Sequence, residues 1–447
     1  MPSGDLGPEP VSPDTIAAVA TPAGRGGIGI VRISGPKVPS IACALLSSVP
    51  EPRVARLTAF RDAGGERVDE GLALYFPAPH SYTGEDVLEL QGHGGAVVTH
   101  EVLRAALDAG ARLAAPGEFT RRAFLNGKRD LAQAEAVSDL IDAASREAAR
   151  SALRSLGGEF SAAIGMLVTQ LTELRALTEA MLDFPEEDVD SLYRGDAQVR
   201  LTRLRAALED VLAKSRQGSL LRSGIRIVLA GRPNVGKSSL LNRLAGEERA
   251  IVAAQPGTTR DALRETILIE GVPLVLVDTA GLRASSDQIE RLGMARTRQE
   301  MAQADVVLLV LEAGNPEPPV EKLPEGATRI EVVNKIDLVP GTPAGRQGER
   351  IHVSAKTGAG LDALRAALLE AAGWNTRGET VFLARERHLR ALRAARVHLE
   401  AAEGQDGQWE FFAEELRLAQ DALGEITGRV SADDLLGEIF ARFCIGK

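Results

Sequence analysis

The chain has few cysteines and no long hydrophobic run. Its two cysteines, Cys43 and Cys444, stand near opposite ends of the sequence, a spacing that predicts neither a disulfide framework nor a zinc site. No apolar stretch reaches the roughly 18 residues that a transmembrane helix needs. Residues 1–13 lack the basic and apolar regions of a signal peptide. We therefore expect a cytoplasmic protein with no membrane partner.

Positive charge is also in short supply. The formal net charge is −10, from 52 lysines and arginines against 62 aspartates and glutamates. Because binding along nucleic acid requires a basic surface, this balance argues against a protein that coats it. It leaves room for a local basic patch or a nucleic-acid-binding partner. The hydrophobic content of 44% is that of a soluble globular protein, and 447 residues suffice for two or three domains.

What the chain does contain is a glycine-rich loop, Gly231-Arg232-Pro233-Asn234-Val235-Gly236-Lys237-Ser238. It fits the pattern G-x-x-x-x-G-K-[ST] and lies between a predicted buried strand at 225–230 and the predicted start of a helix at 239–244. In such a loop, backbone N–H groups and the helix N-terminus face phosphate oxygens. Lys237 would reach the β- and γ-phosphates, and the Ser238 hydroxyl would bind Mg²⁺. An ordinary glycine-containing turn is the alternative for the pattern taken alone.

A second motif, Asp278-Thr279-Ala280-Gly281, follows a predicted strand at 274–277. A carboxylate in this position can hold Mg²⁺ through water, and a glycine N–H can sense the γ-phosphate. The motif therefore supports a nucleoside triphosphate site.

Two further motifs identify the base. Asn334-Lys335-Ile336-Asp337 follows a predicted strand at 330–333. Its aspartate can accept both N1–H and N2–H of guanine, whereas adenine offers no such pair of donors. Ser354-Ala355-Lys356 follows a third strand at 351–353 and places a backbone N–H at guanine O6. Because these motifs occur in this order at predicted strand ends, the sequence predicts a GTP site.

A switch loop is expected about twenty residues after the P-loop, at Pro256-Gly257-Thr258-Thr259-Arg260-Asp261. Thr259 would complete the Mg²⁺ site when the γ-phosphate is present. Arg260 acts either as an arginine finger or as the structural partner of Asp261. Asn234, an amide directly over the phosphates, can bind a monovalent cation whose charge replaces a missing arginine finger.

The residue that orients the attacking water is not in its usual place. Leu282 follows the Asp-x-x-Gly motif, where small GTPases carry a polar side chain. Leucine cannot hydrogen-bond water, so either hydrolysis is slow or another group supplies the function. Asp287 and Glu290 follow on a predicted helix. Glu290 is the better candidate because it opens an amphipathic run, but the spacing fits a solvent-facing acid equally well.

The periodicity of the chain divides it into domains. Residues 14–124 alternate β-rich segments, glycine turns and helical stretches, which predicts an α+β domain. Residues 125–222 and 374–447 have helical periodicity, and residues 223–373 alternate strands and helices as a doubly wound parallel sheet requires. We therefore predict an α/β domain inserted into one helical domain, after a flexible tail at 1–13.

One apolar stripe predicts a long helix. Its members recur at spacings of four and three residues, which predicts the core of a helical bundle. Residues 183–188 are expected to break this helix as a solvated turn. The stripe consists of Phe160, Ile164, Leu167, Leu171 and Leu174.

Five segments beyond the nucleotide motifs carry a family resemblance. They are Asp14-Thr15-Ile16-Ala17-Ala18 with Ala20-Thr21-Pro22, the glycine-rich run 26–35, Tyr82-Thr83-Gly84-Glu85-Asp86 continuing to Gly95, Pro116-Gly117-Glu118-Phe119-Thr120 continuing to Leu131, and Phe443-Cys444-Ile445-Gly446-Lys447. With them the chain resembles the tRNA-modifying GTPase family called MnmE or TrmE over nearly its whole length. Only the N-terminal extension and the switch sequence Ala253-Ala254-Gln255-Pro256 look unusual. Residues of that switch are expected to act through backbone carbonyls.

The resemblance implies a multidomain fold and a reaction. It implies an α+β N-terminal domain that dimerises and binds 5-formyl- or methylene-tetrahydrofolate, an all-α helical domain and an inserted Ras-like P-loop G domain. The homodimer would act with the flavoprotein MnmG (GidA), in a heterotetramer or larger assembly, and FAD would come only with that partner. Together they would add a carboxymethylaminomethyl or aminomethyl group to C5 of the wobble uridine of certain tRNAs.

The resemblance also implies roles for single residues. Potassium-dependent G-domain dimerisation would activate hydrolysis. Glu290 would orient the attacking water through a bridging water, which favours this role over that of a solvent-facing acid. Mg²⁺ would be bound by Ser238 and Thr259, and K⁺ by Asn234, Ala253, Gln255 and Thr258. The folate site would contain Arg32, Glu89, Lys128 and Lys447. GTP would be bound by Asn234, Val235, Gly236, Lys237, Ser238, Ser239, Ala253, Ala254, Gln255, Pro256, Gly257, Thr258, Thr259, Asp278, Thr279, Ala280, Gly281, Asn334, Lys335, Asp337, Ser354, Ala355 and Lys356.

Some alternatives stay open in the sequence. Without the resemblance, Arg32 and Glu89 would be ordinary strand charges. Cys444 fits a half-buried structural thiol as well as a chemical role, and His93 fits a structural loop histidine. At the level of function, the alternatives are a ribosome-assembly GTPase that acts as an RNA-binding switch and a folate-binding scaffold with a vestigial GTPase. The helical, non-GXXG C-terminus disfavours the first, and the intact nucleotide motifs disfavour the second.

Overall fold

The computed structural model describes residues 14–183, 190–246, 264–278, 304–315, 328–374, 381–404, 408–428, 433–441, 443, 444 and 446. Contacts between Cα atoms divide the chain into two compact units. The first unit contains residues 1–138 and 423–447, and the second contains residues 139–422. The tail at 1–13 and the predicted turn after Asp183 lie outside the described residues.

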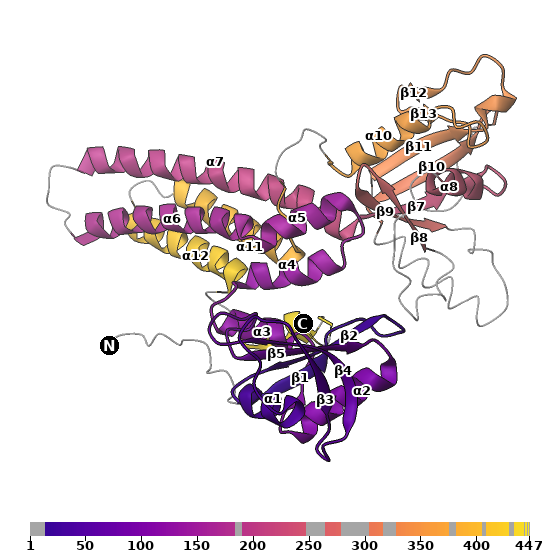
Figure 1. The fold of residues 1–447 in the computed structure, drawn as a ribbon. Coiled ribbons are helices and arrows are strands. Elements are labelled where there is room, and N and C mark those ends of the chain that lie inside the picture. The colour runs from indigo at the N-terminus through magenta and orange to yellow at the C-terminus, as the bar shows by residue number, and fades with distance from the viewer. Residues whose placement is uncertain are drawn as a thin grey trace, which may run out of the picture. The chain divides into compact units, whose positions relative to one another are not determined.

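The first unit is built on a six-stranded sheet (Figure 1). Apart from the parallel pair β1–β6, its neighbouring strands run antiparallel. The strand order is β3-β4-β5-β2-β1-β6. The strands are β1 (Ile16–Val19), β2 (Ile28–Ser34), β3 (Arg56–Arg61), β4 (Arg67–Phe76), β5 (Val87–His93) and β6 (Arg112–Leu113).

The two faces of this sheet differ, because successive side chains of a strand point to opposite sides. On one face, Leu88 and Leu90 of β5 are buried in a core with helices α1 (Val38–Leu46) and α2 (Ala96–Asp108). The other face carries Arg32, which is paired in register with Glu89. Charged residues thus stand on the face opposite the main core.

The C-terminal residues belong to the first unit. Helix α13 (Asp433–Ala441) contacts α3 (Glu118–Leu125). Its Phe440 shares a small buried core with Leu131, the first residue of α4 (Leu131–Ile141). The N-terminal and C-terminal segments of the chain are therefore packed together in one unit, although residues 139–422 lie between them in the sequence.

The α/β part of the second unit is a seven-stranded sheet of order β12-β13-β11-β10-β7-β9-β8. Its five central strands run parallel, whereas β12 and β8 pair antiparallel at the edges. A 3-10 turn, η2 (Ile336–Leu338), follows β11. The other elements are β7 (Ile225–Ala230), α8 (Lys237–Ala245), β8 (Arg264–Ile269), β9 (Val272–Asp278), β10 (Val306–Glu312), β11 (Thr328–Asn334), β12 (Gly345–Gln347), β13 (Arg350–His352) and α10 (Leu361–Ala371).

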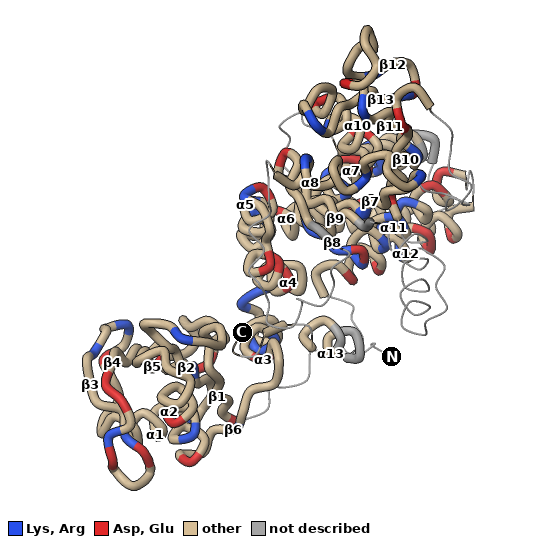
Figure 2. Tube along the Cα trace, turned by 90° about the vertical axis from the view of Figure 1, so that its right-hand side faces the viewer, with Lys and Arg blue, Asp and Glu red and all other residues tan. Residues whose placement is uncertain are grey.

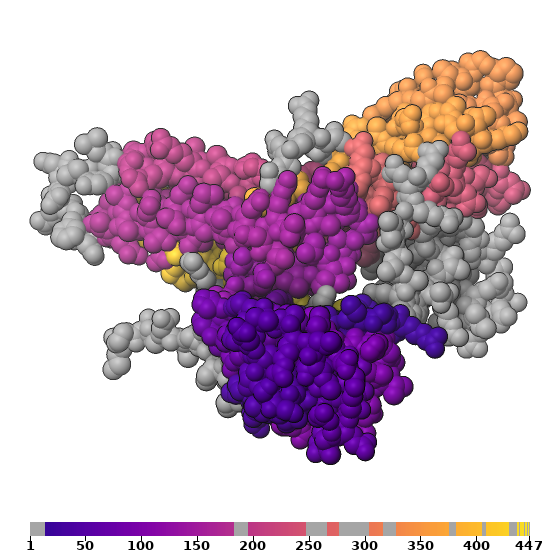
Figure 3. All heavy atoms as spheres, in the orientation of Figure 1, coloured from indigo at the N-terminus to yellow at the C-terminus, as the bar shows by residue number. Residues whose placement is uncertain are grey.

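Long helices form the rest of the second unit, and their side chains fill the space between the ribbons (Figure 3). The predicted stripe on α6 is confirmed, because all five of its apolar residues are buried. Helix α6 packs against α7, and α7 packs against α11. The helices are α5 (Arg146–Leu156), α6 (Glu159–Asp183), α7 (Asp190–Ser223), α11 (Glu386–Glu403) and α12 (Trp409–Thr427).

The chain passes from the helices into the α/β domain and later returns to the helices, and one buried carboxylate contacts both of these connections. Asp139 accepts hydrogen bonds from Arg222 Nε at 2.9 Å and Arg385 Nη2 at 2.8 Å. Arg222 lies just before β7, and Arg385 is the N-cap of α11. The chain therefore enters and leaves the α/β domain at one charged contact.

The fold follows the predicted multidomain class, with an α+β domain, a helical domain and an inserted α/β domain. The strand at 225–230 matches its predicted bounds. The short strands β6 and β12 gave no sequence signal. Within the described residues, no helix is long and apolar enough to cross a membrane.

Candidate functional site

The P-loop joins β7 to α8 through several residues with positive φ, a region that favours glycine. Gly231 has a φ of 147° and Gly236 a φ of 94°. A Cβ on Gly231 would lie 2.3 Å from the carbonyl oxygen of Val310, so the loop passes close to β10. Asn234 also has a positive φ, of 67°, which asparagine tolerates better than most residues. The shape of the loop thus depends on the residue types that defined its sequence pattern.

The predicted phosphate ligands lie at the start of α8. Lys237 is the first residue of the helix, and its ammonium donates to the carbonyl oxygens of Gly231 at 2.6 Å and Arg232 at 3.1 Å. Ser238 and Ser239 are exposed in the first turn. The first N–H groups of a helix have no intrahelical acceptor, so this position suits an anion.

Asn334 connects the P-loop to the predicted base-binding loops. Its side chain is buried, and its amide nitrogen donates to the carbonyl oxygen of Val235 at 2.9 Å. Its amide oxygen accepts from the backbone N–H of Ala355 at 3.0 Å. A Cβ on Gly236 would lie 2.3 Å from the same amide nitrogen. The Asn334 side chain therefore connects its own motif both to the P-loop and to the loop that contains Ala355.

The carboxylate expected to recognise guanine is also oriented by a neighbour. The Ser354 hydroxyl donates to Asp337 Oδ1 at 2.6 Å and accepts from the backbone N–H of Thr357 at 3.2 Å. Asp337 and Lys356 are exposed, whereas Lys335 forms an ion pair with Glu312 at 2.8 Å. An exposed carboxylate beside a buried amide network can accept donors from a bound base.

The remaining nucleotide predictions lie only in part within the described residues. Asp278 is the last residue of β9, in parallel register with Leu229, so its backbone lies at the same sheet edge as the P-loop. That edge is where ligands bind in open α/β sheets. The other predicted positions lie outside the described residues: Ala253, Ala254, Gln255, Pro256, Gly257, Thr258, Thr259, Arg260, Thr279, Ala280, Gly281, Leu282, Asp287 and Glu290.

A second polar site lies on the sheet of the first unit. Arg32 and Glu89, paired on β2 and β5, form an ion pair at 2.9 Å with side chains 20% and 17% exposed. The guanidinium lies over the rings of Tyr82, at 5.3 Å, and Phe119, at 5.8 Å. Arg32 Nη1 also donates to the carbonyl oxygen of Gly446 at 3.4 Å. The two predicted folate residues thus meet among aromatic rings and the C-terminal segment.

The other two predicted folate residues differ in what the structure says of them. Lys128 is exposed, and a Cβ on Gly84 would lie 3.2 Å from its Cγ. Because Gly84 is in the loop that contains Tyr82, this lysine lies near the Tyr82 loop that borders the Arg32 site. Lys447 lies outside the described residues, although the neighbouring Gly446 contacts Arg32.

A buried arginine fixes the loops beneath this site. Arg122 is 3% exposed and forms ion pairs with Asp14 at 2.7 Å, Glu85 at 3.2 Å and Glu118 at 3.0 Å. Burial acts to raise the pKa of Glu118, but hydrogen bonds from Arg112, from the backbone of Ala115 and from Arg122 outweigh it, so that the net pKa is lowered. The pKa of Asp14 is lowered as well, so the cluster keeps the Asp14 and Glu118 carboxylates ionised at neutral pH.

His93 is oriented by a partner that the sequence did not reveal. Its Nδ1 lies 2.7 Å from Asp69 Oδ1, and its backbone N–H donates to Asp69 Oδ2 at 2.8 Å. A Cβ on Gly92 would lie 2.1 Å from that carboxylate, which explains the glycine. Burial acts to raise the Asp69 pKa, and the hydrogen bonds from His93 lower it more. This arrangement accounts for His93 as an oriented residue at the end of strand β5, not in a loop as the sequence predicted.

Sequence reasoning missed the aromatic part of the second site. Tyr82 and Phe119 lie in segments that carry the family resemblance, but no spacing connects either ring to Arg32. Arg129, whose guanidinium lies 5.7 Å from the Tyr82 ring, was missed for the same reason. Only the folded sheet brings these side chains together.

Both cysteines, Cys43 and Cys444, are exposed and free.

Two family models match consecutive parts of the chain. One, described as the GTP-binding protein TrmE N-terminus, matches residues 15–128, and the other, the MnmE helical domain, matches residues 131–444.

Curated relatives match almost the whole chain. The tRNA modification GTPase MnmE of Azoarcus sp. (strain BH72) is 58% identical over 447 residues, which cover 98% of this chain and 99% of that protein. The protein of that name from Thiobacillus denitrificans is 58% identical, with the same two coverages. The one from Neisseria meningitidis serogroup C is 56% identical and covers 97% of this chain and 99% of its own. Among solved structures, the G domain of the T. maritima FeoB iron transporter aligns over 33% of this chain and 98% of its own, at 27% identity with a TM-score of 0.25.

Proposed function

The chain belongs to the MnmE family of tRNA modification GTPases and is a GTP hydrolase, and from this premise we propose the reaction that it serves. With a flavin-dependent partner, MnmG (GidA), it installs a carboxymethylaminomethyl or aminomethyl group at C5 of the wobble uridine of certain tRNAs. A tetrahydrofolate carrier supplies the one-carbon unit. Because its substrate is tRNA, we place the protein in the cytoplasm.

The pairing of Arg32 with Glu89 among aromatic rings is the observation that carries the folate proposal. A pterin offers amide and amino donors that suit a carboxylate, and its flat ring suits Tyr82 and Phe119. Lys128 lies beside the loop that contains Tyr82 and provides positive charge for the glutamate tail of the carrier. We assign Lys447 to the same role.

In the G domain, we propose that K⁺-dependent dimerisation activates hydrolysis. The exposed amide of Asn234, on a loop position with positive φ, supports a cation ligand there. We assign Ala253, Gln255 and Thr258 to the same K⁺, and Ser238 and Thr259 to Mg²⁺. Glu290 orients the attacking water in this proposal, because Leu282 cannot.

We propose that the N-terminal domain, residues 14–124, also forms the homodimer. Ile28, Leu57 and Leu72 are 64%, 68% and 40% exposed. Register pairs place all three on the sheet face that carries Arg32, away from α1 and α2. Exposed apolar side chains on one sheet face support a protein interface. We keep residues 125–222 with 374–447 as the helical domain and 223–373 as the G domain.

The reaction is tested by mass spectrometry of tRNA nucleosides from a strain that lacks the gene. We expect the wobble modification to disappear, to return with the wild-type gene and to stay absent with Glu290→Ala, which still binds GTP. Intact modification in the deletion strain would instead favour the ribosome-assembly alternative.

The cofactor assignments are tested on the purified protein. Exchange of K⁺ for Na⁺ should suppress hydrolysis and dimerisation of the G domains, and equal rates in both salts would refute the Asn234 assignment. Calorimetry should detect 5-formyltetrahydrofolate binding that Arg32→Ala weakens. Absence of heat with the wild-type protein would exclude the folate site.

A further inference from the structure

Helix α5 presents a row of arginines on an otherwise acidic chain. Arg146, Arg150 and Arg154 follow one another at intervals of four residues and are all exposed. Residues four apart lie on the same side of a helix, about 6 Å apart along its axis. Within the described ranges, none of the three has an acidic side chain at ion-pair distance. We call these three residues the α5 ridge; Figure 2 shows basic positions along this helix.

The rest of α5 holds the ridge in place. Its buried side consists of small residues, among them Ala148, Ser151 and Ala152. The only acidic residue of the helix, Glu147, packs against the β8–β9 turn, where a Cβ on Gly271 would lie 2.3 Å from its Oε2. Within the described residues Glu147 makes no ion pair with the ridge, although it lines the same cavity as Arg150 and Arg154, so the three guanidinium groups stay available to a partner.

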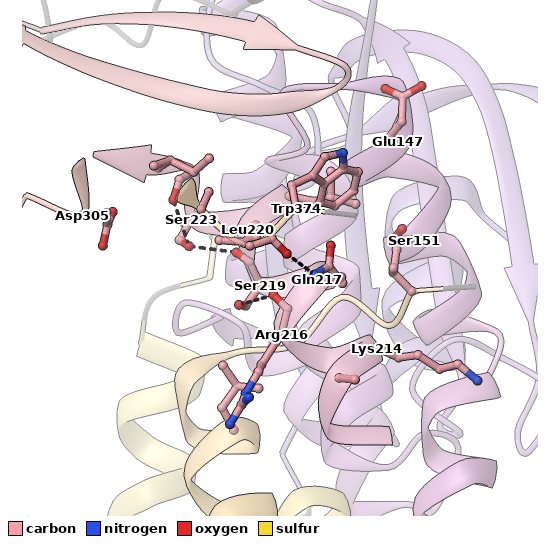
Figure 4. A pocket seen from close by; sticks show the side chains of 18 of the residues that line it. Glu147, Ser151, Lys214, Arg216, Gln217, Ser219, Leu220, Ser223, Asp305 and Trp374 are labelled. Atoms are coloured by element: carbon pink, nitrogen blue, oxygen red, sulfur yellow. Dashed lines mark hydrogen bonds between the residues drawn. The ribbon is translucent and has the colours of Figure 1, made fainter. Parts of the chain in front are cut away.

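A cavity of about 1070 Å³ lies beside the ridge. Arg150 and Arg154 line it together with Lys214 and Trp374. Figure 4 labels the last two of these side chains. Gln217 forms part of its wall, and its amide donates to the carbonyl oxygen of Gly373 at 2.5 Å. The cavity is large enough for a nucleotide-sized group. Its wall offers five cations for phosphate against three carboxylates, and it also contains the indole of Trp374. The cations are Arg150, Arg154, Lys214, Arg216 and Arg393, and the carboxylates are those of Glu147, Asp305 and Glu386.

We propose that the α5 ridge binds the phosphate backbone of the tRNA substrate, an inference that rests on the proposed function. Guanidinium groups bind phosphate oxygens through two parallel hydrogen bonds. A docking surface for a protein normally has an apolar centre, but Leu153 is the only large apolar side chain exposed on α5 within the described residues. Charge on the ridge and the chemistry of the substrate thus favour a nucleic acid over an acidic protein.

The test measures tRNA affinity of the full-length protein at several salt concentrations. Charge reversal in Arg150→Glu/Arg154→Glu should weaken binding at least tenfold, and the slope of log K against log salt should fall by about two. The matched control is Arg203→Glu, an exposed arginine of α7, which should change affinity less than twofold. GTP hydrolysis without tRNA should be equal in all variants and shows that they fold.

A second measurement reports on the cavity itself. The chain has two tryptophans, and Trp409→Phe leaves Trp374 as the only one. Added tRNA should quench its fluorescence, and the double charge reversal should shift the quenching to at least tenfold higher tRNA concentration. A neutral variant, Arg150→Gln/Arg154→Gln, should give an intermediate shift.

Two outcomes would overturn the inference. Equal tRNA affinity and equal salt slope in the wild-type protein and the double variant would remove the ridge from tRNA binding. Unchanged tRNA affinity with lost binding of the flavoprotein would identify a protein docking surface instead. Neither outcome would refute the proposed function, because that function is tested separately in the deletion strain. If the deletion strain keeps the wobble modification, the proposed function itself is refuted.

Discussion

The nucleotide site and the Arg32 site are built in opposite ways. In the nucleotide site, each loop follows a parallel strand, and contiguous motifs provide the backbone and side-chain groups. The Arg32 site takes one side chain from each of β2, β5 and α3, a ring from the loop before β5, and a carbonyl group from the C-terminal segment.

This difference shows where each site is vulnerable. The nucleotide site depends on Asn334, which joins two loops through a buried amide. The Arg32 site has no such central residue, but the loops beneath it depend on the buried Arg122. We therefore expect substitutions at Asn334 to weaken nucleotide binding, and substitutions at Arg122 to lower the stability of the first unit.

The largest effect is expected from Arg122→Met, which removes the buried cation shared by Asp14, Glu85 and Glu118 and leaves only Arg112 as a partner for Asp14 and Glu118. Removal of one partner of a buried ion pair costs roughly 3–5 kcal/mol, so urea unfolding followed by circular dichroism should show a lower midpoint for the first unit. Arg104→Met is the control, because Arg104 is an exposed partner of Glu101 and should change stability by less than about 1 kcal/mol. Equal effects would contradict the role of the Arg122 cluster.

Asn334→Asp should break the nucleotide site without loss of volume. The new carboxylate oxygen would face the carbonyl oxygen of Val235, where the amide now donates. We expect a loss of about 2–4 kcal/mol, or roughly 30- to 700-fold in the Kd of GDP, measured with a fluorescent analogue. The unfolding midpoint of the first unit should not change. Near-normal affinity would show that Asn334 does not hold the loops.

Ser354→Ala should weaken the same site less. It removes the hydroxyl that donates to Asp337, but that carboxylate is exposed and can take a donor from water. We expect about 0.5–1.5 kcal/mol, or about two- to tenfold in the Kd of GDP. A loss as large as that of Asn334→Asp would mean that the serine, not the asparagine, is the central residue.

The smallest effect is a pH dependence confined to the first unit. Burial acts to raise the pKa of Asp14, and hydrogen bonds from Arg112 and Arg122 outweigh it, so its net pKa is lowered, as is that of Glu118. Carboxyls with lowered pKa stabilise the fold above their unfolded values of 3.8 and 4.5, and this contribution is lost as pH falls through the folded values. Unfolding midpoints between pH 6 and about 3 should fall less steeply in Arg122→Met than in the wild-type protein.

The sequence predicted the elements whose signals are local. Periodicity located α6 and its buried stripe, and apolar runs located β7, β9 and β11 with the motifs at their ends. It did not predict β12, whose three residues carry no pattern that distinguishes a strand from a loop. It also gave no sign that residues 423–447 share a compact unit with the N-terminal sheet. A helical pattern shows which face of a helix is apolar, but not which surface will cover it.

By itself, then, the sequence determined the chemistry of the nucleotide site, because contiguous motifs carry their own backbone geometry. The tertiary structure alone decided that Asn334 would join two of those motifs, and that Tyr82, Phe119 and Gly446 would surround Arg32. It alone also placed Arg222 and Arg385 on Asp139. The physical reason is that such contacts join residues far apart in the chain, and the packing of whole elements, not any local pattern, sets their distances.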